Sequence, residues 1–281
     1  MKLLKNKDKE ILNIALPAIV ANITVPLLGL VDVAITGHLG NAAYIAAIAV
    51  GSMLFNVIYW VFGFLRMGTS GMTAQAYGRG DSAETMLLLM RGLCVALAVA
   101  LAVLVLQRPL LALAISVMGV EPSLQPLVRT YFQICVWGAP AMLCLYAFTG
   151  WFIGLQNTRI TMMVSIVQNI VNIVASLVLV YGLGMKIDGV ATGTLIAQWG
   201  GLLVAASYAF LKHRGLLRAL SLRAVTRGEA LMRFFNVNRD IFLRTLFLVA
   251  VNLFFVSAGA TQGTVVLAVN TLLMQLFTLF S

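Results

Sequence analysis

The sequence predicts an all-α polytopic membrane protein, and composition and charge spacing carry this prediction. Of the 281 residues, 61% are hydrophobic and only 10% are charged, and the mean hydropathy is +0.99. Soluble domains contain about 45–50% apolar and about 25% charged residues. Charge-free runs of about 20 residues, long enough to cross a bilayer as a helix, recur along the chain. A soluble globular domain, a disordered chain and a disulfide scaffold are therefore excluded.

The charge-free runs define eight expected membrane-spanning helices. The first run lies between Glu10 and Asp32, and the last, Thr245–Ser281, is interrupted by the small, turn-like residues Ser257–Thr264. The N-terminal run is not a signal peptide, because it is not followed by a cleavage site of small residues and because further membrane spans follow it. The expected spans are residues 10–36, 43–66, 86–107, 129–154, 160–182, 189–211, 239–259 and 264–281.

Lysine and arginine gather on one expected side of the membrane. Most of the 19 lysine and arginine residues lie in three places: the N-terminal tail, the loop between the second and third spans, and the segment 212–239. The loop between the second and third spans is expected to hold Arg79 and Arg91. Because positively charged loops stay in the cytoplasm, the N-terminus and the 6–7 loop are expected there. This rule accounts for the net charge of +10 without a nucleic-acid partner. The basic loop can also contact anionic lipid headgroups.

A weak internal repeat divides the chain. Lys9-Glu10-Ile11 resembles Arg239-Asp240-Ile241, and Asn22 corresponds to Asn252. Two repeated halves are a common plan for transporters. We therefore expect residues 1–211 to form a six-helix N-terminal lobe, 212–238 a basic cytoplasmic inter-lobe loop, and 239–281 the start of a second lobe. On this plan the sequence is a truncated form of a chain of roughly 450 residues.

Asp32 is the one carboxylate well inside an expected span. Ionisable groups at membrane depth are costly and usually functional, so Asp32 is a candidate protonatable switch. Pro17 and Pro26 lie on the same helix, where each removes a backbone hydrogen bond and allows a gating bend. Two alternatives stay open: Asp32 could cap the short turn 37–43, and prolines are common in membrane helices.

The fifth and sixth spans carry a second group of polar residues. Gln168, Asn172 and Ser176 are spaced four residues apart and share one helix face. Thr194 lies just inside the sixth span at a comparable depth. These four residues are candidates for a polar cavity with Asp32, although ordinary interhelical hydrogen bonding would use the same residue types.

Other motifs favour structure over chemistry. The pair Gly150 and Gly154 has the spacing of close helix packing. The sequence contains no metal-ligand spacing, phosphate-binding glycine loop or nucleophile elbow. We therefore expect no enzymatic activity, no catalytic residues, no cofactor and no bound metal.

Four segments resemble the multidrug and toxic compound extrusion (MATE) transporter family, and in particular its DinF branch. They are LNIALPAIVANITVPLLGLVDVAITGHLG (12–40), FLRMGTSGMTAQAYGRGD (64–81), NIVASLVLVYGLG (172–184) and LFLVAVNLFFVSAGATQGTVVLAVN (246–270). The family has twelve spans in two six-span lobes. The resemblance implies one complete lobe here, with about two helices of the second.

The resemblance also assigns roles to individual residues. The family's first-span Asp and bending Pro fall on Asp32 and Pro17, and its fifth-span Asn and sixth-span Thr fall on Asn172 and Thr194. A second family Asp falls on Ser176, so this sequence departs from the pattern there. A Na⁺ site with two carboxylates is therefore not expected, and a single Asp suits coupling to H⁺.

The resemblance implies a secondary active antiporter of the bacterial inner membrane that exports amphipathic or cationic drugs and toxic organic compounds in exchange for H⁺. Its expected partners are those small amphipathic molecules and membrane lipids, and its expected state is a monomer. The alternative is a lipid-linked precursor flippase of the same superfamily, whose cavity would need several basic residues, and only Arg66 and Arg244 are candidates. The 281-residue chain by itself is expected to be inactive in transport, because its second lobe cannot close.

Overall fold

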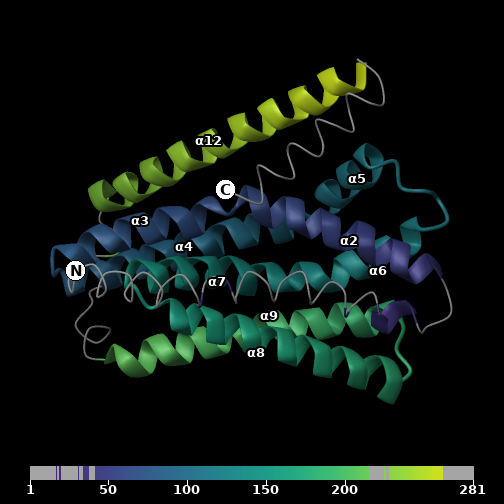
Figure 1. Ribbon diagram of the computed structural model, residues 1–281, viewed down its shortest axis with the longest axis horizontal. Coiled ribbons are helices and arrows are strands. Elements are labelled where there is room, and N and C mark those ends of the chain that lie inside the picture. Colours follow the sequence, from purple (N-terminus) through teal and green to yellow (C-terminus); the bar gives the residue numbers. More distant parts are fainter. Residues whose placement is uncertain are drawn as a thin grey trace, which may run out of the picture.

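The computed structural model describes residues 17, 19, 31, 34–37, 42–214, 225 and 228–261, and within them every regular element is a helix (Figure 1). The predicted all-α class is therefore confirmed. The elements are α2 (Ala42–Val61), α3 (Phe64–Gly78), α4 (Ser82–Val105), α5 (Gln107–Val117), α6 (Gln125–Cys135), η1 (Val136–Gly138), α7 (Ala139–Gly154), α8 (Thr158–Leu177), η2 (Val178–Gly182), α9 (Ile187–Lys212) and α12 (Gly228–Thr261).

Five helical segments of the described chain are long and apolar enough to cross a membrane. Three of them, Gln125–Gly154, Thr158–Gly182 and Ile187–Lys212, match the fourth, fifth and sixth expected spans to within a few residues. Ser82–Val105 matches the third. Most of the first expected span and all of the eighth lie outside the described residues.

The second expected span, 43–66, is much shorter than the helix that the structure contains. Helices α2 and α3 follow each other with only a turn at Phe62 and Gly63, and together form a 37-residue helical segment. At 1.5 Å per residue this segment is about 56 Å long, well beyond the hydrocarbon core of about 30 Å. The polar residues Thr69 and Thr73 do not end the helix, because both are buried within the fold.

Helix α5 has no counterpart among the expected spans. Its 11 residues are apolar but too few to cross a bilayer. Leu111 and Ile115, four residues apart, are buried, so one face of the helix packs on the rest of the bundle. The third expected span ends at 107, where Gln107 and Arg108 interrupt the apolar run, and the apolar residues that follow are too few to predict another span.

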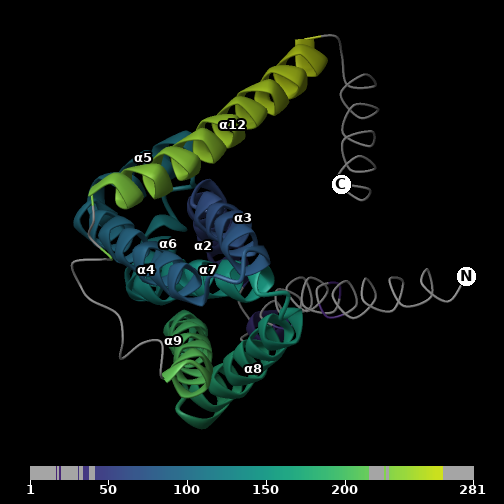
Figure 2. The same cartoon turned by 90° about the vertical axis from the view of Figure 1, so that its left-hand side faces the viewer.

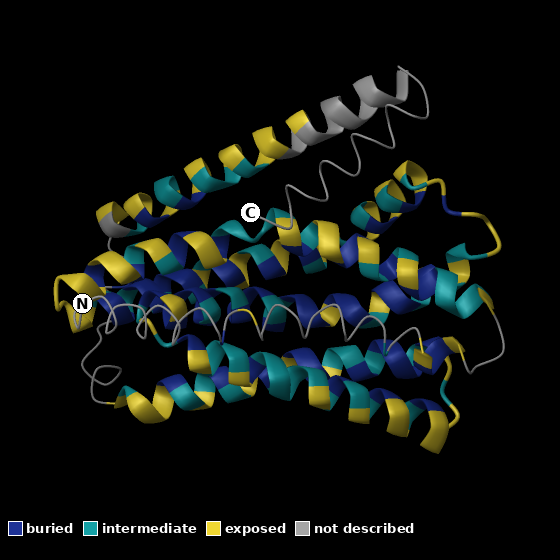
Figure 3. Ribbon diagram, viewed as in Figure 1, coloured by how far each residue is buried: buried dark blue, intermediate teal, exposed yellow. Residues whose placement is uncertain are grey.

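The core is centred on α7, whose residues are mostly buried (Figure 3). A Cβ at Gly150 would overlap the carbonyl of Arg66, and a Cβ at Gly154 would overlap Thr73 and the carbonyl of Ser70. The two glycines therefore let α7 and α3 approach at backbone distance, and the predicted close packing is confirmed.

Arg91 is not a loop residue, contrary to the sequence-based assignment. It lies in α4, is only 2% exposed, and its Nη1 is 2.8 Å from Oε1 of Glu84. Its Nε donates to the carbonyl of Val225 at 3.4 Å. Arg91 can be buried inside a helix because these two acceptors compensate its charge, a condition that charge spacing along the sequence cannot reveal.

Helix α12 begins at Gly228, eleven positions before the expected start at 239. Its first half lies against α3 and α4, and it then diverges towards its C-terminal end (Figure 2). Phe234 is 1% exposed and packs with Ala76 and Leu88. These contacts explain the early start, because the helix gains a buried face before its apolar run begins.

Candidate functional site

Helices α8 and α9 position the predicted polar residues. They pack along each other and form a pair below α4 and α7 in the end-on view (Figure 2). The turn that joins them contains Gly184 at a φ of +68°, a backbone conformation that glycine adopts without strain. Asp188 in the first turn of α9 suits the positive end of the helix dipole.

Asn172 on α8 and Thr194 on α9 are in direct contact. The Nδ2 atom of Asn172 donates to Oγ1 of Thr194 at 3.1 Å, and Thr194 Oγ1 donates to the carbonyl of Val190 at 3.1 Å. Asn172 is 1% exposed. The structure therefore brings together two of the predicted polar residues.

Two buried polar atoms beside this hydrogen bond have no partner among the described residues. They are Oδ1 of Asn172 and Oγ of Ser176, one turn apart on α8. Ser176 is fully buried, and a Cβ at Gly193 of α9 would overlap it. Because buried polar atoms are almost always hydrogen-bonded, this unsatisfied pair marks a place where a further polar group is needed.

Gln168 lies at the same interface, two turns before Ser176. It is half-buried, and a Cβ at Gly201 of α9 would approach its side-chain amide carbon to 3.2 Å. Small residues on α9 thus face the polar residues of α8 at two levels. All four predicted polar residues lie along one helix pair.

The end of α8 contains a feature that sequence reasoning missed. Val178–Gly182 form a π-helical turn, a wide turn that is frequent at functional sites. From this turn, the hydroxyl of Tyr181 donates to the carbonyl of Ile35 at 3.3 Å. The outer end of the first span therefore contacts the end of α8. No composition signal distinguishes this turn from a regular helix.

The remaining predicted residues belong to the first span. Pro17 is described, and it is helical and buried. Asp32 and Pro26 lie outside the described residues, so their predicted roles stay predictions. Thr36, which is described, is fully buried in the same segment.

Sequence reasoning also missed a buried polar pair elsewhere in the bundle. Tyr59 of α2 and Gln198 of α9 are 7% and 9% exposed. The two side chains are close enough to interact, although neither Tyr59 Oη nor Gln198 Oε1 has a well-aligned hydrogen bond to a described residue. Gly138 leaves room for Gln198, since a Cβ there would overlap its Oε1 atom. A lone Tyr and Gln in apolar runs carry no motif that could have drawn attention to them.

No group of three or more His, Cys, Asp or Glu side chains in the described part of the chain could hold a metal ion. The described side chains of the candidate site supply amide and hydroxyl groups. Such groups donate and accept hydrogen bonds, and can therefore bind a carboxyl group or a small polar ligand.

The helices and the buried polar site define a multi-pass helical membrane protein. Residues 17–178 match the MatE family, and the chain belongs to that family. The predicted resemblance is thereby confirmed.

Two curated relatives are similar over much of this chain. DNA damage-inducible protein F of Escherichia coli (strain K12) is 37% identical over 280 residues, which are 99% of this chain and 61% of the relative. A probable multidrug resistance protein NorM of Acinetobacter baylyi is 28% identical over 207 residues, 72% of this chain and 45% of the relative. The chain thus spans about half to three fifths of the length of these relatives.

Solved transporters share the fold. The bent form of the Vibrio cholerae MATE transporter VcmN superimposes with a TM-score of 0.77 at 19% sequence identity, over 97% of this chain and 61% of that chain. An outward-facing multidrug resistance MATE family transporter gives a TM-score of 0.79 at 21% identity, over 91% of this chain and 56% of that chain. The predicted MATE-like lobe architecture is confirmed by these superpositions.

Proposed function

We propose that this chain forms the first lobe of a proton-coupled antiporter that exports amphipathic or cationic organic compounds, with Asp32 as its proton switch. The observation that carries the proposal is the pair of unsatisfied, buried polar atoms on Asn172 and Ser176. A carboxyl group that can be protonated or ionised would satisfy them in alternate states. The names of the relatives, a multidrug resistance protein among them, support export as the activity.

The contact between Tyr181 and Ile35 supports a location of Asp32 near this pair. Asp32 precedes Ile35 by three residues, about 4.5 Å along a helix, and Ser176 precedes Tyr181 by five, about 7.5 Å. On this count the carboxyl and the hydroxyl lie at similar depth. Apolar surroundings favour the neutral form of a carboxyl group in general, which is the property that a proton carrier needs near neutral pH.

H⁺ is the coupling ion that the side chains favour. Sodium ions bind best to several oxygen ligands with compensating negative charge, whereas Ser176 supplies a neutral hydroxyl next to Asn172. A neutral amide and a hydroxyl instead stabilise a carboxyl group in both of its protonation states. Pro17 would allow the first span to bend when the carboxyl changes state.

The basic residues support an N-terminus and an inter-lobe segment in the cytoplasm of a bacterial cell, with the chain in the inner membrane. At one end of the bundle lie Arg79 after α3, Arg159 at the start of α8 and Lys212 at the end of α9. The opposite end holds Arg108, Arg129 and Lys186, whereas the first end also holds Arg91, Arg214 and Arg233. This asymmetry is the one that the positive-inside rule describes.

Asp32→Asn tests the proton switch. In everted membrane vesicles that contain the complete transporter, we expect ethidium transport driven by a pH gradient to fall to background, because an amide cannot exchange a proton. Replacing the pH gradient by a Na⁺ gradient should not drive transport in the wild type.

Asp81→Asn is the matched control, since Asp81 is exposed and caps α4 by accepting from the backbone N–H of Glu84 at 2.9 Å. Asn caps the N-terminus of a helix as well as Asp does, so the Asp81→Asn variant is expected to transport at the wild-type rate. Wild-type transport by Asp32→Asn would sink the proposed mechanism.

A further inference from the structure

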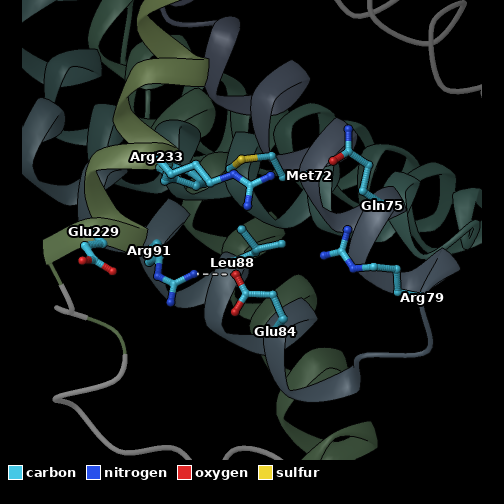
Figure 4. A pocket seen from close by; sticks show the side chains of 9 residues that line it. Met72, Gln75, Arg79, Glu84, Leu88, Arg91, Glu229 and Arg233 are labelled. Carbon is cyan, nitrogen blue, oxygen red and sulfur yellow. Dashed lines mark hydrogen bonds and ion pairs between the residues drawn. The ribbon is translucent and has the colours of Figure 1, made fainter.

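A charged pocket lies between α3, α4 and the start of α12, away from the candidate site on α8 and α9. Its volume is about 350 Å³. Its buried floor includes Leu88 of α4 and Phe234 of α12. Arginine, glutamate and glutamine side chains from all three helices form its walls (Figure 4).

The arginines of this pocket differ in how their charge is compensated. Arg91 is buried, is paired with Glu84 at 2.8 Å and is bonded to Val225. Arg79 and Arg233 are exposed, and no ion pair joins either of them to another residue that the structure describes. Both guanidinium groups extend towards the pocket, from opposite sides (Figure 4). With Glu229 as the remaining carboxylate, the pocket carries a net positive charge.

The pocket lies at the ends of three helices, two of which belong to segments long and apolar enough to cross a membrane. Arg79 directly follows α3, Glu84 is in the first turn of α4, and Glu229 is in the first turn of α12. Three helix ends therefore meet at the pocket. In the orientation proposed above from the distribution of basic residues, this end of the bundle faces the cytoplasmic leaflet, which contains anionic lipids.

The geometry points to a binding site for the phosphate headgroup of an acidic phospholipid in the cytoplasmic leaflet. Guanidinium groups bind phosphate through paired hydrogen bonds, and two of them face one opening here. Gln75 adds an amide donor to the same wall. Exposed Met232 and Phe235, beside Arg233 on α12, offer apolar surface to the acyl chains. A phospholipid therefore fits this site better than free phosphate does, because free phosphate matches the headgroup but has no acyl chains.

Native mass spectrometry of the purified chain in detergent tests this site. It is titrated with phosphatidylglycerol and with phosphatidylcholine of the same acyl chains. We expect tighter binding of phosphatidylglycerol, and a loss of roughly 25-fold in its affinity in the double variant Arg79→Gln/Arg233→Gln, since each basic side chain near the headgroups contributes about fivefold. Glu229→Gln should strengthen binding about fivefold by removing a repulsive charge.

The matched control is Arg108→Gln/Arg129→Gln, which removes two exposed positive charges on α5 and α6. It should bind phosphatidylglycerol as the wild type does. Unchanged affinity in Arg79→Gln/Arg233→Gln, or an equal loss in the control, would overturn the site. Complete displacement of the lipid by millimolar inorganic phosphate would overturn its assignment to a lipid. These binding measurements do not require transport. Their outcome therefore tests the lipid site independently of the antiport proposal.

Discussion

Ser176 is a buried polar residue whose hydroxyl group does not stabilise the fold, which points to a role in function. Its hydroxyl is fully buried and has no partner among the described residues, while Asn172 beside it donates to Thr194. A buried hydroxyl without a hydrogen bond is destabilising, so the residue at this position is not explained by folding alone. The position is where the family's second Asp falls, and the smaller Ser fits against Gly193.

Ser176→Ala should therefore separate folding from transport. We expect the free energy of unfolding to stay the same or to rise by up to about 1 kcal/mol, because an unsatisfied hydroxyl is removed. Asn172→Ala should lower it by about 1–2 kcal/mol through loss of the bond to Thr194. Both variants should transport less than the wild type. Thermal unfolding in detergent and vesicle transport measure the two effects, and a strongly destabilised Ser176→Ala would contradict this account.

At the scale of helices, the contact between α3 and α7 is set by glycine. Gly150 and Gly154 leave no space for a side chain against the backbone of α3. Gly71, also on α3, has nothing within 4 Å of where its Cβ would be. Spacing alone predicted the packing role of Gly150 and Gly154, but not which helix they meet.

Gly150→Ala and Gly71→Ala should shift stability in opposite directions. Gly150→Ala pushes a methyl group against the carbonyl of Arg66 and should cost about 1–3 kcal/mol. Gly71→Ala should raise the free energy of unfolding by up to about 1 kcal/mol, because alanine favours a helix interior more than glycine does. Unfolding midpoints of the two variants in one detergent provide the measurement. A neutral Gly150→Ala would mean that α3 and α7 are not in backbone contact.

At the scale of the whole molecule, a few side chains hold the first part of α12 against α2, α3 and α4. Phe234 is buried against α3 and α4, Asn238 is 2% exposed beside Gly68, and Phe242 packs edge-on against Phe64 at 5.6 Å between ring centroids. These contacts fix the position of the start of α12 relative to α2 and α3.

Phe234→Ala should lower the free energy of unfolding by about 3–5 kcal/mol, because it leaves a cavity in this contact. Its neighbour is the matched control: Phe235 is 55% exposed, so Phe235→Ala should change stability by no more than about 0.5 kcal/mol. Thermal unfolding of both variants tests the docking. Equal effects of the two substitutions would show that α12 does not pack here.

The sequence by itself determined the class, the approximate position of most spans and the candidate polar residues. It could do so because helices in lipid must be apolar over about 20 residues, and charged or amide groups stand out against that background. It also indicated a comparable depth for Ser176, Thr194 and Asp32, since helical rise is constant.

The tertiary structure alone decided the contacts between distant segments. The Asn172–Thr194 hydrogen bond, the Tyr181 contact to Ile35 and the burial of Arg91 beside Glu84 each depend on which helices are neighbours. The hydropathy of one helix does not specify its neighbours, because lipid tails and apolar side chains are equally favourable surroundings. For the same reason, the charged pocket between α3, α4 and α12 could not be seen before the three helix ends were placed together.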